Sequence, residues 1–476
     1  MASLDGKHFD AVILGAGMSG LAAGIRAAHF GQNTLIVERH NAPGGLNSFY
    51  SLDGRRYDVG LHAMTNYVPP GVKGAPLVKL LRQLRLSRED FDLAEQNGSR
   101  IVVGDRSLAF NNDFSLLESE IAREFPQQID GFLTLDAAVR SFPDTDLDQP
   151  FLSARAVLAR HLTDPVLIEM LLLPLLYYGS SREDDIDFAQ FAIMYKAIFR
   201  EGFARPYDGV RRIIRALTDR YRELGGIRKM KCGVQSIEHD GRAVRALRLD
   251  DGSRITAGQV VSSAGWLETL ALCEPSLSDG PADNQGKLSF VETITVLDCQ
   301  PATLGWEDTI VFFNEDENVR YRCPDERTDG RSGVICFPNN YRYSEGRILE
   351  EGWLRVTALA SYDRWAKLQD EAYQRAKTED YDHLLRQALR FLPDVPEATV
   401  RQHTVATDMF TPLTVERFTG HRGGAIYGSR DKNRRGLTPL ENLHLCGTDQ
   451  GFLGITGAML SGISMANLHL LGGSTG

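Results

Sequence analysis

The sequence predicts an α/β protein whose parallel sheet is assembled from separate stretches of the chain. An apolar strand over 11–14 runs into a Gly-x-Gly-x-x-Gly turn over 15–20, which opens a helix of small residues, and a second strand over 34–37 ends at Glu38. Near the other end, over 442–462, a strand again meets a glycine, an acid and a small-residue helix. Because both ends carry this pattern, we expect one discontinuous domain that encloses inserted segments.

The first glycine turn has the residues that a dinucleotide needs. Gly15 permits the tight turn from strand to helix, Gly17 lets a pyrophosphate approach the backbone, and Gly20 lets the helix pack closely on the strand. The positive N-terminus of the helix faces the phosphates, and Glu38 is placed to accept hydrogen bonds from ribose hydroxyls. Since strand, helix, second strand and acid fall in register, the motif predicts dinucleotide binding rather than a glycine turn without a ligand.

Composition limits the class of protein and its partners. The chain has 476 residues, enough for two or three domains, and a formal net charge of −10, which gives no support to a nucleic-acid partner. The six cysteines show no Cys-x-x-Cys or metal-like spacing and favour reduced thiols and no metal. The first ten residues leave no room for a secretory signal, and the apolar run over 166–178 is too short to span a bilayer. We therefore expect a cytoplasmic protein that at most rests on a membrane.

The segments after the first unit begin with a hairpin and then turn helical. Strands over 48–52 and 56–59 are joined by Asp53-Gly54, a hairpin signal. The stretch 76–86 has leucines on one face and basic residues elsewhere, which predicts an amphipathic helix, either on a membrane or on the protein surface. From 113 to 221 the sequence is mostly helical.

Strands dominate the second half of the chain. Three are expected over 234–262, four more over 289–361, and a helical stretch over 364–391 follows. We therefore expect three parts of the nucleotide-binding domain at 1–75, 221–285 and 421–476, a helical insert that faces substrate or membrane at 76–220, and a substrate domain of mixed sheet and helices at 286–420.

At this point several motifs together resemble one protein family. They are the opening over 10–45, Tyr-Asp-Val-Gly over 57–60, Pro-Tyr-Asp-Gly over 206–209, and the stretch 416–428 that leads into 442–462. The chain resembles the FAD-dependent phytoene desaturases, carotenoid isomerases and retinol saturases of the amine-oxidase flavoprotein superfamily. The resemblance implies a discontinuous Rossmann-like FAD-binding domain with a parallel sheet of the ββα type, an interleaved mixed-sheet substrate domain and a helical insert.

The resemblance also implies which residues hold FAD. The first glycine motif and Glu38 would bind its ADP half, the Gly44-Gly45 turn would approach the phosphates, and Val234 would bond the adenine through its backbone. Asp449 would face the ribityl and phosphate groups, and the last helix would begin under the flavin pyrimidine, where its N-terminus stabilises negative charge. The predicted cofactor residues are Gly15, Gly17, Met18, Ser19, Gly20, Glu38, Arg39, Gly44, Gly45, Leu46, Val234, Ala264, Gly265, Gly447, Asp449, Ile455, Thr456 and Gly457.

Two places depart from the family pattern, and both bear on the reaction. The stretch 450–454 lacks the proline-bearing sequence of the desaturases, and His62 stands where many relatives have proline nearby. His62 is the candidate acid or base near the flavin, against the alternative of a hydrogen-bonded structural histidine. His421 and Arg422 would support the pyrophosphate. Aromatic residues at helical spacing are candidates for a substrate tunnel, against the alternative of an ordinary core stripe: Phe188, Phe191, Tyr195 and Phe199.

These expectations lead to one favoured function and two alternatives. The favoured one is an FAD-dependent oxidoreductase that desaturates, saturates or isomerises a long apolar polyene or isoprenoid by hydride transfer at flavin N5. The first alternative is a flavin amine oxidase, for which Lys287 is the lysine nominated near the flavin. The second is a prenyl-binding escort protein that has lost its flavin, which the intact Gly15–Glu38 motif argues against. Hydrolase and kinase motifs do not occur.

Overall fold

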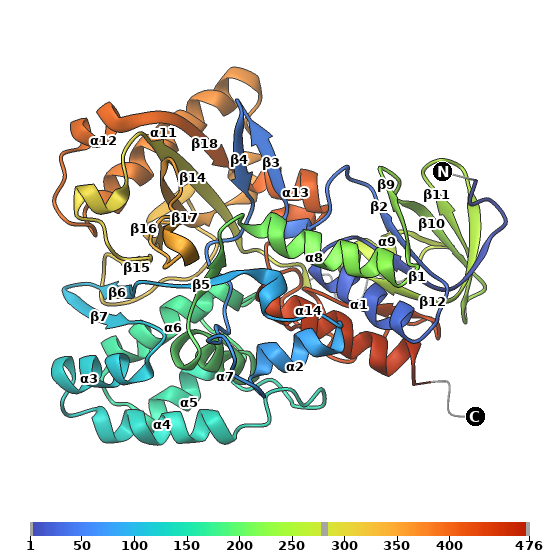
Figure 1. The fold of residues 1–476 in the computed structure, drawn as a ribbon, viewed down its shortest axis with the longest axis horizontal. Coiled ribbons are helices and arrows are strands. Elements are labelled where there is room, and N and C mark those ends of the chain that lie inside the picture. The colour runs from blue at the N-terminus through green and yellow to red at the C-terminus, as the bar shows by residue number, and fades with distance from the viewer. Residues whose placement is uncertain (1–2, 278–283, 473–476) are drawn as a thin grey trace.

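Two large sheets, two small two-stranded sheets and the helices packed on them make up the described part of the molecule (Figure 1). The computed structural model describes residues 3–277 and 284–472. In the view of Figure 1 the first sheet lies to the right, near both termini, and the second lies to the upper left. Below the second sheet lie the helices of the insert, α3 (Phe114–Glu124), α4 (Ile129–Ser141), α5 (Ala154–His161), α6 (Pro165–Gly179) and α7 (Phe188–Tyr195).

The first sheet is parallel at its centre and discontinuous in sequence, as predicted. Its parallel strands lie in the order β19 (Leu443–Leu445), β12 (Arg254–Ser262), β1 (His8–Leu14), β2 (Thr34–Glu38) and β9 (Ile227–Met230). The other half of β12 pairs with an antiparallel extension, β11 (Val244–Leu249) and β10 (Val234–His239), and β10 pairs in parallel with β13 (Cys273–Glu274). The ends and the middle of the chain therefore meet in one sheet.

Two helices rich in small residues cross on this sheet, α1 (Met18–His29) and α14 (Gly454–Met465). A Cβ atom on Gly462 would collide with the carbonyl oxygen of Ser19, and one on Gly20 would collide with that of Gly15. The small residues therefore let the backbones approach within contact distance.

The predicted amphipathic helix is α2 (Pro76–Gln83). Its apolar side chains Leu77, Leu80 and Leu81 are buried in the same core as α1 and α8 (Val210–Glu223). Because that face is covered by protein, it is not free to enter a membrane. No helix in the described part of the chain is long and apolar enough to cross a bilayer.

The second sheet is almost wholly antiparallel and is covered on both faces. Its order is β18 (Thr404–Phe410), β14 (Ser289–Leu297), β17 (Gly352–Ala360), β16 (Thr328–Cys336), β15 (Ile310–Asn314), β6 (Ser99–Val103) and β7 (Arg106–Phe110), with only β15 and β6 parallel. In β15, Ile310 and Phe312 pack on the helices of the insert, whereas Val311 and Phe313 pack on α11 (Asp370–Leu389). This alternation explains the unbroken apolar sequence of the strand.

Short elements join these layers. The predicted hairpin is β3 (Phe49–Leu52) and β4 (Arg55–Asp58), and Asp53 and Gly54 both have positive φ, as a two-residue hairpin turn requires. A second pair joins β5 (Leu93–Glu95) to β8 (Ala204–Pro206). The remaining helices are α9 (Trp266–Ala271), α10 (Tyr362–Trp365), α12 (Glu397–His403) and α13 (Pro412–Thr419), and short 3-10 or π turns lie at Gly45–Asn47, Glu89–Phe91, Lys196–Arg200, Pro301–Leu304, Ser344–Gly346, Arg422–Gly424 and Ala466–Leu470.

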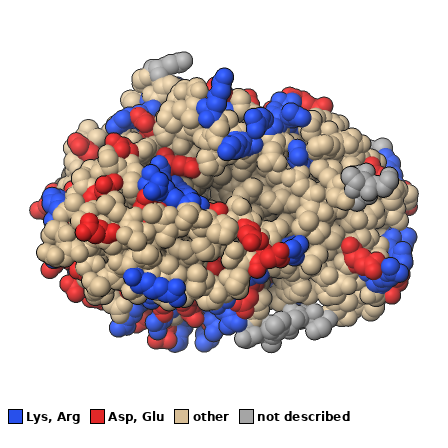
Figure 2. Space-filling model, turned by 90° about the horizontal axis from the view of Figure 1, so that it is seen from below, with Lys and Arg blue, Asp and Glu red and all other residues tan. Residues whose placement is uncertain are grey.

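The surface charges are mixed in sign. Figure 2 shows the face that lies below in Figure 1, where basic and acidic side chains form small neighbouring groups. On the described part of this face there is no broad basic area of the kind that binds a nucleic acid.

Candidate active site

A cavity of about 900 Å³ lies between the two sheets. From the first sheet it is lined by the ends of β1 and β2 and by β10, and from the second by β14, β16, β17 and β18. The beginnings of α1 and α14, the end of α6 and one side of α13 complete its wall. Its volume lies within the roughly 300–1,000 Å³ typical of ligand pockets.

The end of the cavity at the first sheet is formed by the predicted glycine motif. Gly15 has a φ of 97°, which a residue with a side chain rarely adopts, and it turns the chain from β1 toward α1. Helix α1 begins after Gly17 with no side-chain cap, so its first N–H groups are free to face a ligand. A Cβ atom on Gly17 would meet no protein atom within 4 Å. Gly17 therefore leaves open space toward the cavity.

Glu38 lies at the end of β2 in the same wall and is buried. Its Oε2 accepts a hydrogen bond of 2.8 Å from the backbone N–H of Ala16, and its Oε1 accepts one of 2.9 Å from that of His40. These bonds fix the carboxylate, and each oxygen keeps a lone pair for a hydroxyl donor.

The middle of the cavity is lined by the turn after β2. Gly44 and Gly45 have φ values of 120° and 59°, and the Gly44 N–H donates a 2.9 Å hydrogen bond to Ala16. This bond holds the turn against the first glycine motif. Of the predicted cofactor residues, those that line the cavity are Gly15, Gly17, Met18, Ser19, Glu38, Arg39, Gly44, Gly45, Leu46, Val234, Ala264, Gly447 and Ile455.

The remaining five predicted cofactor residues lie behind the wall. Gly20 packs on the turn at Gly15, Gly457 packs on the backbone of Phe452, and Gly265 precedes α9. The Thr456 hydroxyl lies 3.4 Å from the carbonyl oxygen of Thr65, to which it donates. Their contacts shape the wall without reaching the cavity.

Asp449, the fifth of these residues, points away from the main cavity. Its Oδ1 accepts from the Ser429 N–H at 2.6 Å, and its Oδ2 accepts from the Ser429 hydroxyl at 3.1 Å and from the Trp266 N–H at 2.5 Å. The carboxylate thus ties the loop around Ser429 to α9, and its role toward the ribityl and phosphate groups stays a prediction.

The start of α14 closes the cavity beside the second sheet. This helix has Leu453 as its N-cap, again without a side-chain cap, and Gly454, Ile455 and Ala458 line the cavity. Its positive N-terminus therefore lies at the cavity wall, and the placement of Thr456 and Gly457 under a flavin ring stays a prediction. His421 also lines the wall, and its Nδ1 lies 2.8 Å from the carbonyl oxygen of Ala425.

A charged cluster lies in the wall formed by the second sheet. The Nε2 atom of His62 is 3.3 Å from Oε1 of Glu292 and 3.1 Å from the hydroxyl of Thr357. The same carboxylate is bonded by the guanidinium of Arg355. Burial alone would raise the pKa of Glu292, but the charges of Arg355 and His62 and their hydrogen bonds outweigh it and lower the pKa to about 2. The carboxylate is therefore ionised.

Only His62 of this cluster was identified from the sequence. The other members come from different strands, Glu292 from β14 and Arg355 and Thr357 from β17. One sequence feature could have identified Glu292. It is a charged residue in the middle of a strand whose other residues are apolar or carry hydroxyl groups.

Aromatic side chains surround the rest of the inner end. The rings of Tyr177 and Phe290 stack with centroids 5.6 Å apart, and Tyr427 lies edge-on to Phe290 at 6.1 Å. Burial raises the pKa of Tyr177, Tyr178 and Tyr427, so these phenols stay neutral. This wall is apolar apart from the His62 cluster.

The aromatic residues predicted to line a tunnel lie elsewhere. Phe188 stacks on Phe191 at 5.7 Å, and Tyr195 meets Phe199 edge-on at 5.4 Å. All four are buried in the core between the insert and the second sheet, and they are absent from the described wall of the cavity. Helical spacing identified a buried face correctly, but that face packs on protein; Tyr177, Tyr178, Phe290 and Tyr427 line the cavity instead.

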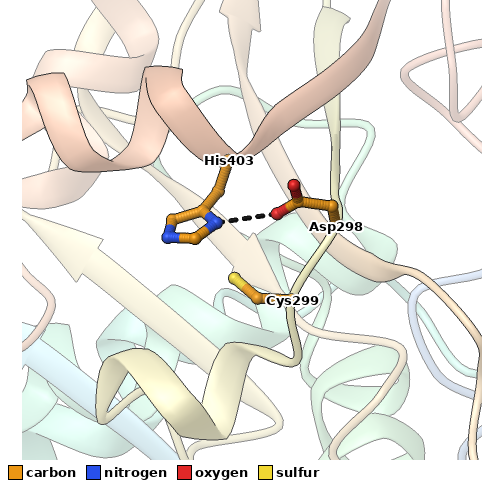
Figure 3. Close-up of side chains that lie close together, drawn as sticks. All are labelled: Asp298, Cys299 and His403. Atoms are coloured by element: carbon orange, nitrogen blue, oxygen red, sulfur yellow. Dashed lines mark hydrogen bonds and ion pairs between the residues drawn. The ribbon is translucent and has the colours of Figure 1, made fainter.

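A separate group of metal-ligand types lies at the far end of β14 (Figure 3). His403 Nδ1 is 2.7 Å from Oδ1 of Asp298, the Cys299 thiol lies beside them, and the three ligand atoms are within 4.8 Å of one another. No sequence motif predicted this group, because the pairing of β14 with β18 brings it together. None of the three lines the cavity.

The residues of the main cavity fit FAD. Two helices begin at its wall with uncapped N–H groups, Gly17 leaves room for a pyrophosphate, and Glu38 offers fixed acceptors at the end of β2. The first helix and Glu38 would hold the adenosine and phosphates, and the start of α14 would face the flavin.

Comparison with known proteins supports FAD as the cofactor. The model of the family described as flavin containing amine oxidoreductase matches residues 18–468. The chain is 22% identical to an all-trans-retinol 13,14-reductase of Danio rerio, over 99% of this chain and 88% of the relative. It is also 22% identical to a 4,4'-diaponeurosporene oxygenase of Staphylococcus haemolyticus, over 88% of this chain and 86% of the relative.

Solved structures share the fold. An oxidoreductase from Methanosarcina mazei has a TM-score of 0.67 at 16% identity, over 96% of this chain and 99% of the other. A putrescine oxidase bound to putrescine has a TM-score of 0.61 at 17% identity, over 97% and 98%. From the family match and the cavity together, we conclude that the chain belongs to the flavin-containing amine oxidoreductase family and is an FAD-dependent oxidoreductase.

Proposed function

We propose that this oxidoreductase acts on a long apolar polyene or isoprenoid lipid. The observation that carries the proposal is the inner end of the cavity, where Tyr177, Tyr178, Phe290 and Tyr427 form an aromatic wall beside the start of α14. Such a wall binds an extended apolar chain by burial and offers it few polar partners. Two relatives whose names refer to retinol and to diaponeurosporene support the same substrate class.

The chemistry needs a hydride acceptor or donor and a group that moves a proton. Bound FAD supplies hydride chemistry at flavin N5. In desaturation, one carbon of the substrate would lose a hydride, the chemistry that FAD would supply, the neighbouring carbon would lose a proton, and the remaining electron pair would form the new double bond. Saturation is the reverse. The aromatic wall holds the reacting carbons in place and excludes water.

We assign the proton transfer to His62. Its Nε2 faces the ionised carboxylate of Glu292, so the stable neutral tautomer carries its hydrogen on Nε2 and leaves Nδ1 as the acceptor. When Nδ1 takes a proton, the nearby carboxylate stabilises the imidazolium. His62 Nδ1 is thus the proposed base in desaturation and the proposed acid in saturation.

The competing hypothesis is an amine oxidase, since a putrescine oxidase shares the fold. Two observations weigh against it. Lys287, the lysine nominated near the flavin, is exposed, and no lysine occurs among the described residues that line the cavity. Glu292, the acid at the aromatic end, is already paired with Arg355 and is not free to bind a substrate ammonium.

An anaerobic titration tests the proposal. We would record the visible spectrum of the purified holoenzyme before and after adding phytoene or retinol in liposomes, with putrescine as the amine control. Bleaching of the oxidised flavin band together with a longer-wavelength polyene spectrum is expected for desaturation. For saturation, pre-reduced flavin should regain its oxidised band as the polyene spectrum shortens. Flavin bleached by the amine and unaffected by every polyene would contradict the proposal.

A further inference from the structure

Three side chains with metal-binding atoms meet at the end of β14, away from the main cavity (Figure 3). Asp298 and Cys299 directly follow β14, and His403 is the last residue of α12, directly before β18. Nδ1 of His403 is 2.7 Å from Oδ1 of Asp298, and the three donor atoms lie within 4.8 Å of one another. Donor atoms around tetrahedral zinc are about 3.3–3.6 Å apart, so side-chain adjustments of about 1 Å would enclose an ion.

The backbone holds the three residues of this group at fixed positions. The Asp298 N–H donates a 3.0 Å hydrogen bond to the carbonyl oxygen of His403. The carbonyl oxygen of Cys299 packs on Gly352, the first residue of β17, where a Cβ atom would collide with it. Because β14, β17 and β18 position the ligands in advance, an ion binds with little further ordering of the chain.

The donor set favours zinc among the common divalent ions. Asp298, Cys299 and His403 offer one oxygen, one sulfur and one nitrogen. Calcium and magnesium bind almost wholly through oxygen, whereas zinc binds thiolate, imidazole and carboxylate in a tetrahedron. Among the residues that the structure describes, three side chains form the group, so a water molecule would be the fourth ligand. A thiolate and a carboxylate together balance the two charges of Zn²⁺.

The surroundings of the group let an ion enter. The side chain of Asp298 is 56% exposed and that of His403 is 35% exposed. Cys299 lies deeper, where it packs against the apolar core between the second sheet and α11. The basic residue two positions before His403, Arg401, is held in ion pairs with acidic side chains on α11 and α12. An ion can therefore reach the group from solvent, and the charge of Arg401 is already compensated.

An ion at this place would join two parts of the second sheet. The strand β18 lies at the edge of that sheet and pairs with β14. Their register shifts between Val296 and Leu297, immediately before Asp298. The other end of β18, Phe410, lines the main cavity. A link across the start of β18 would therefore hold an edge strand that forms part of the cavity wall.

We propose that Asp298, Cys299 and His403 bind a Zn²⁺ ion, which links the start of β18 to the end of β14. As the ion binds Nδ1 of the neutral imidazole, the ring hydrogen moves to Nε2, and the Cys299 thiol gives its proton to the solvent. Cysteine spacing predicted no metal, because His403 lies 105 positions from Asp298 and local motifs do not detect such a group. The zinc site is independent of the substrate of the enzyme.

Metal binding to the untagged, FAD-loaded protein tests the proposal. The protein is treated with EDTA, kept reduced with a phosphine, and dialysed against Zn²⁺ to measure the Kd and the number of ions bound per chain. Co²⁺ is then used as a spectroscopic probe. We expect the strong visible bands of tetrahedral Co²⁺, at wavelengths beyond the flavin absorption, and a thiolate-to-cobalt band in the near-ultraviolet difference spectrum.

Variants at two of the ligands locate the site. Cys299→Ser and His403→Gln should each raise the Kd for Zn²⁺ by about 100-fold, and Cys299→Ser should lose the thiolate-to-cobalt band. Cys323→Ser is the matched control, because Cys323 is also a partly buried free thiol but lies outside the group. This variant should keep the Kd and the cobalt spectrum of the wild type. The flavin spectrum of each variant verifies that it has folded.

A melting experiment tests the link between the strands. Zn²⁺ at 100 times its Kd should raise the melting temperature of the FAD-loaded wild type by about 2–5 °C and leave that of Cys299→Ser unchanged. Absence of zinc binding to the wild type, an octahedral cobalt spectrum, or wild-type affinity in Cys299→Ser would overturn the proposal. These measurements need no polyene. Failure of the zinc site therefore leaves the proposed function standing, and a flavin that no polyene bleaches leaves the zinc site standing.

Discussion

Glu292 shows how one buried charge can organise the histidine that we propose as the proton-transfer group. Its carboxylate meets Arg355, whose guanidinium also donates to the carbonyl oxygens of Leu61 and Asp58 at 3.1 Å each. Burial of a carboxylate is costly unless it is paired, and here the pairing also fixes the segment that carries His62. The carboxylate therefore controls both the tautomer and the position of the imidazole.

Replacing this carboxylate tests that role. Glu292→Gln keeps the shape of the side chain but removes its charge, so the imidazolium of His62 loses its counter-charge. In anaerobic single-turnover measurements at saturating polyene, we expect flavin bleaching to slow by about 100-fold while the polyene Kd stays within about threefold.

The matched control is Glu351→Gln. Glu351 also pairs with an arginine, Arg55, at 2.7 Å, but it lies outside the cavity wall. Its bleaching rate should equal that of the wild type. An unchanged rate in Glu292→Gln would refute the assigned role, and an equal loss in both variants would point to a general effect on folding.

The residues of this cluster mark the limit of sequence analysis. The glycine motif and Glu38 were predictable because consecutive residues build that turn, so the sequence itself contains the geometry. Glu292 and Arg355 are 63 positions apart and meet only because β14 pairs with β17. Nothing in the local sequence specifies the register of β14 on β17, and so the cluster could be identified only from the structure.

The crossing of α1 and α14 brings the backbones of two helices into contact beside the site. Gly462 lies against the backbone of α1 at Ser19 and Ala23, where a Cβ atom would come within 2.9 Å of the Ala23 nitrogen. Close packing of this kind holds the two N-termini at fixed positions relative to the cavity.

A single methyl group at this crossing should disturb it. Gly462→Ala must push the helices apart, and we expect a loss of about 1–3 kcal/mol in the free energy of unfolding, measured by urea denaturation of the holoenzyme. FAD affinity should fall as well, since both N-termini move.

Gly98→Ala provides the comparison. A Cβ atom at Gly98 would make only an ordinary contact, 3.8 Å from the Phe110 carbonyl oxygen. This variant should keep its stability and its FAD affinity. If the two variants were equally stable, the packing of α1 on α14 would tolerate an added methyl group, and the close contact at Gly462 would not be required for stability.

Helical periodicity proved informative about burial but not about the partner of the buried face. The spacing of Phe188 to Phe199 predicted a hidden stripe, and α7 with its extension has one, but the stripe packs on protein in the core. The leucine face of 76–86 likewise packs on α1 and α14. Sequence patterns specify which face is apolar, whereas the arrangement of the layers decides whether it meets protein, ligand or lipid.

Across the whole molecule, the main cavity is shared by both sheets. Its wall takes residues from the first sheet at Glu38 and from the second at Glu292. A ligand in this position contacts both sheets, and binding to the folded state alone stabilises the whole assembly by mass action.

FAD should therefore raise the melting temperature of the flavin-free protein. At a free concentration of 100 times Kd, the expected gain is about 2.7 kcal/mol of unfolding free energy. Gly17→Ala should remove most of the shift, because its added methyl group occupies the space facing the pyrophosphate. The same variant should melt like the wild type without FAD, since a Cβ atom there meets no protein atom within 4 Å. A lower melting temperature of the flavin-free variant would contradict this account.

The distance along the chain between β1 and β19 has a consequence for biosynthesis. β19 pairs in the first sheet and α14 packs beside it, yet both leave the ribosome long after β1 and β2. Domains made of continuous sequence fold in turn as the chain emerges, at about 5–20 residues per second. Here the strands β1 and β2 are made first and must wait for their distant partners. The nascent protein can complete its cofactor site only after α14 has emerged, and premature termination anywhere before residue 454 leaves a chain without the second helix N-terminus of that site.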